Sequence, residues 1–506
     1  MKNIVVAGAG AAGWLAALHA KSLFNDDSNI EVTVVYDDKI PIIGVGESTT
    51  PGFLEFLEKY IKIPVWEILK YCEGTFKSGI KFKNWKGDGS YYYHTFTHSR
   101  IDDCCAALSC GLRADDIDRA AQLSEANKVP IKNNNVEINE DVYLNTNLAL
   151  HFNAKLMAEY LQKVGKERGI KVVTGKIEDA VLDDSGFVSE IVLDTKQRIK
   201  TDFIYDCTGF SRFFVDKIFH SPMEYYDKEL TTKRAMPFFL DKTDPTPPYT
   251  EAIAMKYGWM WKIPVGERYG CGYCFDSDFV SDEDAYKEIC EVTGQKPEVR
   301  KKINFKPGYH TKPLNKNTLA IGLSHGFLEP LEATSLMISV EMIHMLFQLT
   351  PNIFNKKSWI GNDVFEKDFN KLVQDFVHGC VDFVKVHYLT PRNDTEFWKK
   401  GRDNISKRLE KRLKGVSDFD ITKPNFIMDS SSGNISFQMR NYIQCMSGVD
   451  MIDKDMIKRN TREHLYSEVH NNAKKYKYIT ELSKNNDDAI NDFISKKAAM
   501  SSGFRV

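Results

Sequence analysis

This 506-residue sequence lacks several features that would immediately identify its class of protein. The sequence has no large excess of charge of one sign, because 68 lysines and arginines are balanced by 70 aspartates and glutamates. This balance gives no reason to expect nucleic acid or an anionic membrane as a partner. The apolar stretch 4–20 has glycines where a nucleotide-binding turn needs them, so we expect no membrane span there. Internal repeats and long low-complexity linkers are also missing.

Dense metal-ligand patterns are missing too. The ten cysteines occur without a secretory signal layout, which predicts reduced thiols and a cytoplasmic location. Cys271 and Cys274 have CxxC spacing, but no second pair lies near them. The strand-like alternation around them favours core or surface cysteines over a redox or zinc site. The twelve histidines form no HExxH pattern, and we therefore expect no metal.

What is present begins with a strand, a glycine turn and a helix. A β-branched run at 4–7 is followed by Gly8, Gly10 and Gly13 and then by helical sequence. Such glycines let the backbone approach a pyrophosphate at a helix N-terminus. A second apolar run at 30–35 leads to Asp37, whose carboxylate suits a ribose. The pattern predicts a dinucleotide site, and a glycine turn without a ligand is the alternative.

The rest of the chain predicts an α/β fold with two to four domains or subdomains. A buried strand at 202–206 runs into another glycine turn, and residues 230–300 are rich in strand-like and aromatic sequence. These predict a β-rich layer over the nucleotide domain. Helices are expected at 53–71, 101–145, 151–161 and through most of the chain after 360. The last forty residues predict a surface helix with a fraying tail.

Two loops have sequences suited to ligands. In 43–52, backbone N–H groups and the hydroxyls of Ser48 and Thr49 are able to bind ligand oxygens, and an ordinary polar loop is the alternative. In 326–335, a helix is expected from Leu336, and Thr334 or Ser335 near its start offers N–H groups that suit a small anion. A capped helix with solvated carboxylates is equally supported on local sequence. Because a carboxylate is unfavourable beside an anion, Glu332 is expected to point elsewhere.

Two strand-like stretches leave their roles open. Alternation at 75–85 places Lys77 on a lysine-rich face, which spacing alone predicts to be solvated. Aromatic and imidazole groups at 91–98 line a pocket or form a core strand. Trp259 and Trp261 point to one face of a strand that Pro264 ends, and they fill a core or form the wall of a tunnel.

Six of these stretches, in this order, resemble the tryptophan-halogenase family of flavin-dependent halogenases. They are GAGAAGW at 8–14, GVGEST at 44–49, FKSGIKFKNW at 76–85, DCTGF at 206–210, WMWKIP at 259–264 and FLEPLEATS at 327–335. The WxWxIP stretch distinguishes the family from other flavin monooxygenases, whereas the glycine fingerprint does not. The resemblance covers residues 3 to about 345.

The resemblance implies an FAD-binding Rossmann-like domain of the flavin monooxygenase type over 1–350. This domain would contain a helical insert at 101–145 and a β-rich layer at 225–300. A mainly helical C-terminal region, 351–506, would cover the substrate. A homodimer or higher homo-oligomer is compatible with this arrangement, although the sequence does not give the oligomeric state.

The resemblance also implies a reaction. Reduced FAD reacts with oxygen to form a flavin hydroperoxide, and a halide (chloride, bromide or iodide) attacks it to give hypohalous acid. The acid passes through a tunnel to an aromatic small molecule. Lys77 stands at the essential lysine and acts by a hydrogen bond or as a haloamine. Glu332 stands at the catalytic glutamate, which positions the halogenating agent or takes the ring proton.

The resemblance assigns further residues to each part of the site. Thr334 and Ser335 would meet the halide, His94 and Phe96 the substrate, and Trp259, Trp261 and Pro264 the tunnel. The residues expected to contact FAD are Gly8, Ala9, Gly10, Ala12, Gly13, Asp37, Ile40, Ile43, Val45, Ser48, Ile177, Leu323 and Leu336.

The chain departs from the family pattern in ways that change its expected specificity. Ala333 replaces a serine and Ser335 replaces a glycine, which suggests a halide preference shifted toward bromide or iodide. The C-terminal aromatic clamp for free tryptophan is not recognisable, so another indole or a phenol is the expected substrate. No second nucleotide fingerprint is visible, and a separate NAD(P)H-dependent flavin reductase is expected.

Two other functions remain open on the sequence. The first is a flavin-dependent hydroxylase or epoxidase that inserts oxygen directly into its substrate. Trp259 and Trp261 argue against it if they separate the substrate from the flavin ring. The second is a non-catalytic flavoprotein, which leaves the placement of Lys77 and Glu332 unexplained.

Overall fold

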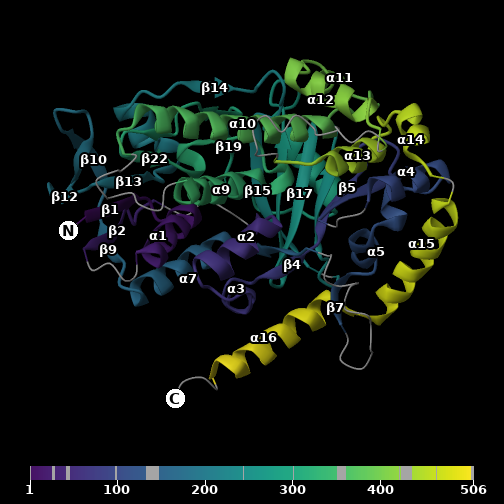
Figure 1. Cartoon of the computed structure of the whole chain (residues 1–506), viewed down its shortest axis with the longest axis horizontal. Coiled ribbons are helices and arrows are strands. Elements are labelled where there is room, and N and C mark those ends of the chain that lie inside the picture. The colour runs from purple at the N-terminus through teal and green to yellow at the C-terminus, as the bar shows by residue number, and fades with distance from the viewer. Residues whose placement is uncertain are drawn as a thin grey trace.

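A computed structural model describes the chain over residues 2–24, 29–40, 46–96, 100–132, 147–242, 244–299, 301–349, 360–420, 422, 436–462 and 464–502. Its N-terminal strands gather on one side of the molecule, a larger sheet stands in the middle, and helices cover both (Figure 1). None of the described helices combines the length and apolarity needed to span a membrane.

The N-terminal sheet confirms the expected α/β nucleotide-binding fold. Strands β1, β2, β9, β13 and β22 pair in parallel, so their carboxyl ends meet at one edge, where ligands of such sheets bind. Helices α1 (Ala11–Leu23) and α7 (Ala154–Glu167) pack against each other beside it. The strand order is β21 (Leu314–Asn315), β22 (Thr318–Ala320), β13 (Phe203–Asp206), β1 (Lys2–Ala7), β2 (Ile30–Tyr36) and β9 (Lys171–Thr174).

The larger sheet is the expected β-rich layer, and it recruits two strands from the earlier lysine-rich and tyrosine-rich segments. Strand β5 pairs in parallel with β16, and β6 forms the far edge. Residues 79–95 are therefore joined to residues 234–304. The order is β19 (Ile303–Asn304), β15 (Arg234–Asp241), β18 (Arg268–Phe275), β17 (Gly258–Val265), β16 (Tyr249–Ala254), β5 (Gly79–Lys83) and β6 (Tyr91–Thr95).

The other strands of the described residues form four small sheets. The most important for the site joins β3 (Glu47–Ser48), β8 (Ala149–Phe152) and β4 (Thr75–Lys77), because it brings residues 47–49 beside Lys77. The others are β10 (Ile177–Leu182) with β11 (Val188–Leu193) and β12 (Arg198–Lys200), β14 (Met223–Tyr225) with β20 (Gly308–His310) and β23 (Gly326–Phe327), and β7 (Lys128–Lys132) with β24 (Ser483–Asn485).

The remaining helices lie around these sheets, with α10 running above α9 in Figure 1. Helix α10 contacts α9 and α13, and α13 also contacts β6, so the C-terminal helices pack onto the N-terminal half of the chain. These helices are α2 (Pro51–Glu55), α3 (Val65–Tyr71), α4 (Ile101–Ser109), α5 (Arg119–Glu125), α8 (Asp282–Thr293), α9 (Thr334–Leu349), α10 (Asp363–His387), α11 (Glu396–Gly401), α12 (Lys407–Ser417), α13 (Met439–Gly448), α14 (Lys454–Asn460), α15 (Leu465–Leu482) and α16 (Asn486–Ser502).

Three helix expectations need correction. The helix predicted over 53–71 is interrupted by a π-helical segment, Phe56–Tyr60, and by a non-helical stretch before α3. The start of the helix predicted at 151–161 belongs to β8, because backbone pairing with β3 and β4 competes there. The 101–145 insert contains α4 and α5 but also strand β7, and residues 133–146 lie outside the described part.

The C-terminal segment is more integrated than a surface helix with a fraying tail. Strand β24 pairs antiparallel with β7, and α16 follows it at once. The Phe493 ring lies edge-on to Phe76, with ring centroids 5.8 Å apart. Helix α16 therefore supports the strand that carries Lys77.

Candidate active site

A cavity of about 1330 Å³ opens at the carboxyl edge of the parallel sheet. Its wall contains these residues of the expected FAD set: Gly8, Ala9, Gly10, Ala12, Gly13, Asp37, Ile40, Ser48, Ile177, Leu323 and Leu336. Ile43 and Val45, also expected to contact FAD, lie outside the described residues. The same wall continues past Trp259 and Trp261 to Glu332, Thr334 and Ser335.

The glycine turn has the geometry that a dinucleotide needs. Gly8 has φ +124°, and a Cβ there would lie 2.1 Å from the Cys207 carbonyl oxygen. A Cβ at Gly13 would lie 2.2 Å from the Gly8 carbonyl oxygen, so both close approaches require glycine. Gly10 is the N-cap residue of α1, and no side chain caps the free N–H groups of this helix. The residues present therefore fit the pyrophosphate of FAD at this helix N-terminus.

The two tryptophans of β17 lie on one face, as their spacing predicts. Their ring centroids are 6.2 Å apart, and both side chains are buried although they line the cavity. Trp261 lies across Gly272 of β18, where a Cβ would come within 2.1 Å of the indole. Pro264 is not in the cavity wall, and it lies inside β17 instead of ending the strand.

Lys77 is fully buried, unlike the solvated lysine that spacing alone predicts. The predicted single strand is divided at Ser78 into β4 and β5, which removes Lys77 from the exposed face of Lys83. Its Nζ donates to the Thr49 carbonyl oxygen at 2.8 Å and lies 5.0 Å from the centre of the Phe96 ring. Phe96 therefore lies beside the lysine.

The position of Thr49 depends on β8. Its backbone N–H donates to the Leu150 carbonyl oxygen at 3.0 Å, and its hydroxyl exchanges two further hydrogen bonds with Leu150. The Thr49 carbonyl is thereby held toward Lys77. Burial lowers the pKa of Lys77 to about 7, although the charge of Glu332 opposes this shift. The amine therefore changes protonation state near neutral pH.

Glu332 has an unusual backbone conformation. Glu332 and Ala333 have φ +65° and +55°, between the turn at Pro330 and helix α9. Such consecutive left-handed residues without glycine cost about 1–3 kcal/mol each and are typical of functional sites. The helix begins at Thr334, two residues before the predicted start. Thr334 and Ser335 are the first residues of this helix and lie in the cavity wall, where the resemblance places the halide.

The Glu332 carboxylate lies between two buried imidazoles. His94 Nδ1 is 2.8 Å from Oε2, and His387 Nε2 is 3.0 Å from Oε1. Burial by itself raises the pKa of Glu332, but His94 and His387 outweigh it and hold this pKa well below its usual range. The Glu332 carboxylate thus faces two imidazoles that the local sequence did not reveal.

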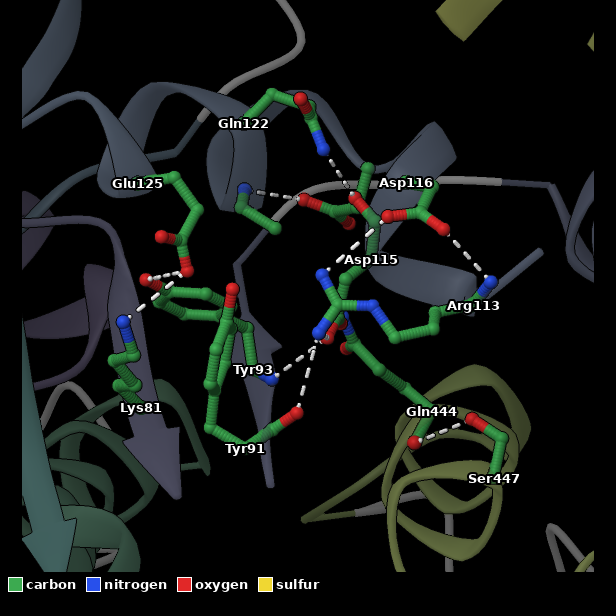
Figure 2. A network of polar contacts seen from close by, with 12 residues as sticks. Lys81, Tyr91, Tyr93, Arg113, Asp115, Asp116, Gln122, Glu125, Gln444 and Ser447 are labelled. Atoms are coloured by element: carbon green, nitrogen blue, oxygen red, sulfur yellow. Dashed lines mark hydrogen bonds and ion pairs between the residues drawn. The ribbon is translucent and has the colours of Figure 1, made fainter. Parts of the chain in front are cut away.

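A network on the reverse face of β6 holds the strand that carries His94 (Figure 2). The Tyr93 backbone N–H donates to Asp115 Oδ2 at 3.2 Å, and the Tyr93 hydroxyl donates to Glu125 at 2.8 Å. Lys81 Nζ also donates to Glu125, at 3.1 Å. Because β6 is a sheet edge, Asp115 satisfies a backbone N–H that has no neighbouring strand, and Glu125 holds the Tyr93 and Lys81 side chains.

One group of metal-capable side chains was found among the described residues. Donor atoms of His94, Glu332 and Cys445 all lie within 4.8 Å of one another. Both His94 nitrogens already have hydrogen-bond partners, Glu332 and Asn441, so the geometry favours a hydrogen-bonded carboxylate. All ten cysteines are free, and Cys271 and Cys274 are buried in β18.

Sequence reasoning missed His387, His151 and Glu329 in this region. His151 Nε2 and Nδ1 lie 2.9 and 3.0 Å from the hydroxyls of Thr250 and Thr75. Glu329 accepts hydrogen bonds from Thr232 and Tyr388, and burial raises its pKa to about 7. His151 and His387 had no motif signal, whereas Glu329 belongs to the FLEPLEATS stretch.

Comparisons with known proteins agree with this geometry. A family model described as tryptophan halogenase matches residues 3–462. The chain is 29% identical over 462 residues to tryptophan 6-halogenase SttH of Streptomyces toxytricini, covering 84% of this chain and 86% of that protein. It is 28% identical over 433 residues to tryptophan 7-halogenase RebH of Lentzea aerocolonigenes, covering 79% of each.

A comparison with solved structures shows that tryptophan halogenases share this fold. The structure of MibH, a tryptophan 5-halogenase, has a TM-score of 0.87 to this chain at 22% identity, over 99% of this chain and 95% of that one. The family model covers most of the residues, including both the flavin cavity and the Lys77–Glu332 region. The chain therefore belongs to the tryptophan halogenase family, flavin-dependent enzymes that use FADH2, oxygen and halide to halogenate an aromatic substrate.

Proposed function

We propose that this enzyme halogenates an indole- or phenol-type small molecule other than free tryptophan, with Lys77 and Glu332 as its catalytic residues. The observation that carries the proposal is the fully buried Lys77, which is hydrogen-bonded to Thr49 directly after Ser48 of the cavity wall, and the same wall contains Glu332. FADH2 bound in that cavity would give its electrons to oxygen, and oxygen would supply the oxidising equivalents for the halide. The residues Gly8–Gly13, Asp37 and Ser48 would hold the FADH2.

Halogen transfer then depends on the protein. The aromatic carbon bonds to the halogen of hypohalous acid, the halogen–oxygen bond breaks, and hydroxide leaves. A protonated Lys77 donates a hydrogen bond to this oxygen and so stabilises the departing charge, whereas a neutral Lys77 takes up the halogen itself as a haloamine. The carbon–hydrogen electron pair returns to the ring, and its proton leaves to a base. Glu332, with its lowered pKa, is an anion that stabilises the cationic ring before this step.

The C-terminal region, 351–506, is proposed to cover the substrate. Asn441 on α13 supports this, since its amide nitrogen lies 3.0 Å from His94 Nε2. His94 also faces the rings of Phe383 and Phe437, with centroids 5.0 and 6.2 Å away. An aromatic substrate suits such surroundings.

We also propose a separate NAD(P)H-dependent flavin reductase as partner and a cytoplasmic location. Ten free thiols support a reducing compartment. Purified enzyme with FAD and NADH alone is expected to leave substrate unchanged, and addition of a flavin reductase is expected to start turnover.

The test of the function is mass spectrometry of a mixed indole and phenol panel, with a flavin reductase and each halide in turn. We expect one hydrogen to be replaced by one halogen in at least one member of the panel. Products that gain oxygen instead would favour the hydroxylase alternative, which family membership does not favour.

A further inference from the structure

The carboxylate of Glu332 has a second imidazole partner that does not belong to any of the family-like motifs. His387 lies at the C-terminal end of α10 and is fully buried. Its ring is stacked on Phe82, with centroids 4.3 Å apart and planes 11° apart. Its Nδ1 is 2.8 Å from the Tyr92 hydroxyl, and its Nε2 faces Glu332.

The proton on His94 can be placed from Asn441. Asn441 Oδ1 accepts the backbone N–H of Gln438 at 2.7 Å, so the amide nitrogen is the atom that faces His94 Nε2. An amide nitrogen only donates, and Nε2 must therefore be the unprotonated acceptor. His94 carries its proton on Nδ1 and donates it to Glu332 Oε2 at 2.8 Å.

The same reasoning applies to His387. A carboxylate only accepts, so the proton belongs on Nε2, and Nδ1 accepts from the Tyr92 hydroxyl. Burial raises the pKa of Tyr92 well above its usual value and keeps this hydroxyl protonated. The 3.0 Å approach of Nε2 to Glu332 Oε1 lies outside standard hydrogen-bond geometry, and neither atom has another partner within the described residues. Pairing of these two buried atoms removes the cost of leaving both unsatisfied.

We propose that His387, oriented by Tyr92, is a positioning residue that holds the Glu332 carboxylate in place for halogen transfer. The inference rests on the proposed function of Glu332. With an imidazole on each oxygen, the carboxylate cannot turn about its last bond. Displacement of a reacting group by about 1 Å costs about 100-fold in rate, so loss of one holder should be visible in turnover.

The principal experiment compares His387→Leu with His387→Gln in the full-length protein, supplied with FAD, a flavin reductase, bromide and the best substrate of the panel. Leucine removes the donor, whereas a glutamine amide can restore an N–H near the position of Nε2. We expect His387→Leu to lower kcat by about 100-fold with KM within about twofold, and His387→Gln to recover at least about tenfold. Full kcat in His387→Leu, or equal losses in both variants, would overturn the proposal.

A second pair of variants, each lacking one hydroxyl, tests the contacts from Tyr92 through His387 to Glu332. Tyr92→Phe removes the hydroxyl that orients His387, and we expect a loss of about tenfold in kcat, the effect of one hydrogen bond. Tyr93→Phe is the matched control, because Tyr93 is on the same strand but donates to Glu125 on the reverse face (Figure 2). Equal kcat values for the two variants would contradict the proposal even if His387→Leu fails to fold.

A readout independent of turnover separates this inference from the proposed function. In protein labelled with ¹⁵N-histidine, we expect His387 to be protonated on Nε2 and His94 on Nδ1. Glu332→Gln should shift the signals of both, and Tyr92→Phe should shift His387. An opposite tautomer of His387, or no response to Glu332→Gln, would overturn the positioning role. Absence of halogenated product with the expected tautomers would instead reject the proposed function.

Discussion

Lys77 donates through its Nζ to the backbone carbonyl oxygen of Thr49 at 2.8 Å. This single carbonyl acceptor fixes the direction of a buried lysine without neutralising its charge. Burial therefore dominates, and the pKa of Lys77 falls to about 7. The same strand-to-loop contact joins the lysine to the segment that carries Ser48 in the flavin cavity.

Lys77→Ala is expected to abolish halogenation and to leave flavin binding and oxygen consumption intact, because Lys77 is not part of the cavity wall. Turnover should fall by at least about 1,000-fold, comparable with loss of a charged group that acts in the transition state. Product mass spectrometry and flavin absorbance measure the two properties. Lys83→Ala, on the exposed end of β5, is the control and should retain activity.

The pH dependence of turnover should reveal which form of Lys77 acts. With a pKa of about 7, the side chain is an ammonium below neutrality and an amine above it. If the ammonium donates a hydrogen bond, kcat should decline as pH rises through 7. If the amine forms a haloamine, kcat should increase over the same interval. A wild-type pH profile with no inflection between pH 6 and 8 would contradict both roles.

Lys77 should also reduce stability at neutral and mildly alkaline pH. Between its folded pKa of about 7 and its ordinary pKa of 10.5, the unfolded chain binds a proton that the folded chain does not. The free energy of unfolding therefore rises with pH in this window. At pH 7.5, Lys77→Met removes this cost, and we expect roughly 1–3 kcal/mol of added stability by denaturant unfolding.

Lys385→Met is the matched control for that stabilisation. Lys385 is also buried, but its Nζ donates to the carbonyl oxygens of Glu229, Gly401 and Asp403 at 2.9, 2.6 and 2.5 Å. Methionine would leave these carbonyls without their donor, at a cost of roughly 3 kcal/mol. We therefore expect Lys77→Met to raise the free energy of unfolding and Lys385→Met to lower it. Destabilisation by both would show that Lys77 is also structurally required.

Gly272→Ala is expected to displace the indole of Trp261, because a Cβ there would lie 2.1 Å from the ring. Overpacking of this kind costs about 1–3 kcal/mol. We expect changed tryptophan fluorescence and a lower yield of halogenated product per oxygen consumed, since Trp261 lines the flavin cavity. Gly415→Ala in α12 meets no atom within 4 Å and should leave both properties unchanged.

Ser335→Gly should shift halide preference toward chloride. Ser335 lies in the cavity wall at the first turn of α9, where a side chain narrows or reshapes an anion site. Competition between chloride and bromide in one reaction measures the ratio of products, and we expect it to change by about tenfold. Ser339→Ala, one turn further along in the same wall, is the control. Strict chloride preference in the unmodified enzyme would refute the expected bias toward bromide or iodide.

Local patterns predicted the nucleotide sheet well. The β-branched run before Gly8 and the acidic end of the second strand are local features, and parallel pairing of β1 with β2 follows from them. The tryptophan pair on β17 was also predictable, because alternation in a strand puts i and i+2 on one face. The predicted helices were less accurate at 101–145 and 151–161, where pairing with distant strands outweighs local propensity.

The environment of each candidate catalytic residue could not be predicted in the same way. The alternating pattern predicted that Lys77 lies on a solvated strand face, yet β4 pairs with β8 and the Lys77 side chain is completely buried. Glu332 was expected to turn from an anion site, but its partners come from β6 and α10. Such contacts join residues separated by hundreds of positions, and nothing in the local sequence marks them.

By itself the sequence determined the α/β fold, the glycine turn suited to a dinucleotide and the residue types available for chemistry, because turns, periodicity and helix starts depend on neighbouring residues. Only the tertiary structure decided that Lys77 is buried away from water and that Glu332 lies between His94 and His387. The physical reason is that desolvation and charge pairing depend on which distant elements enclose a side chain. The reactivity of this site is therefore set by packing between β4, β6, α9 and α10.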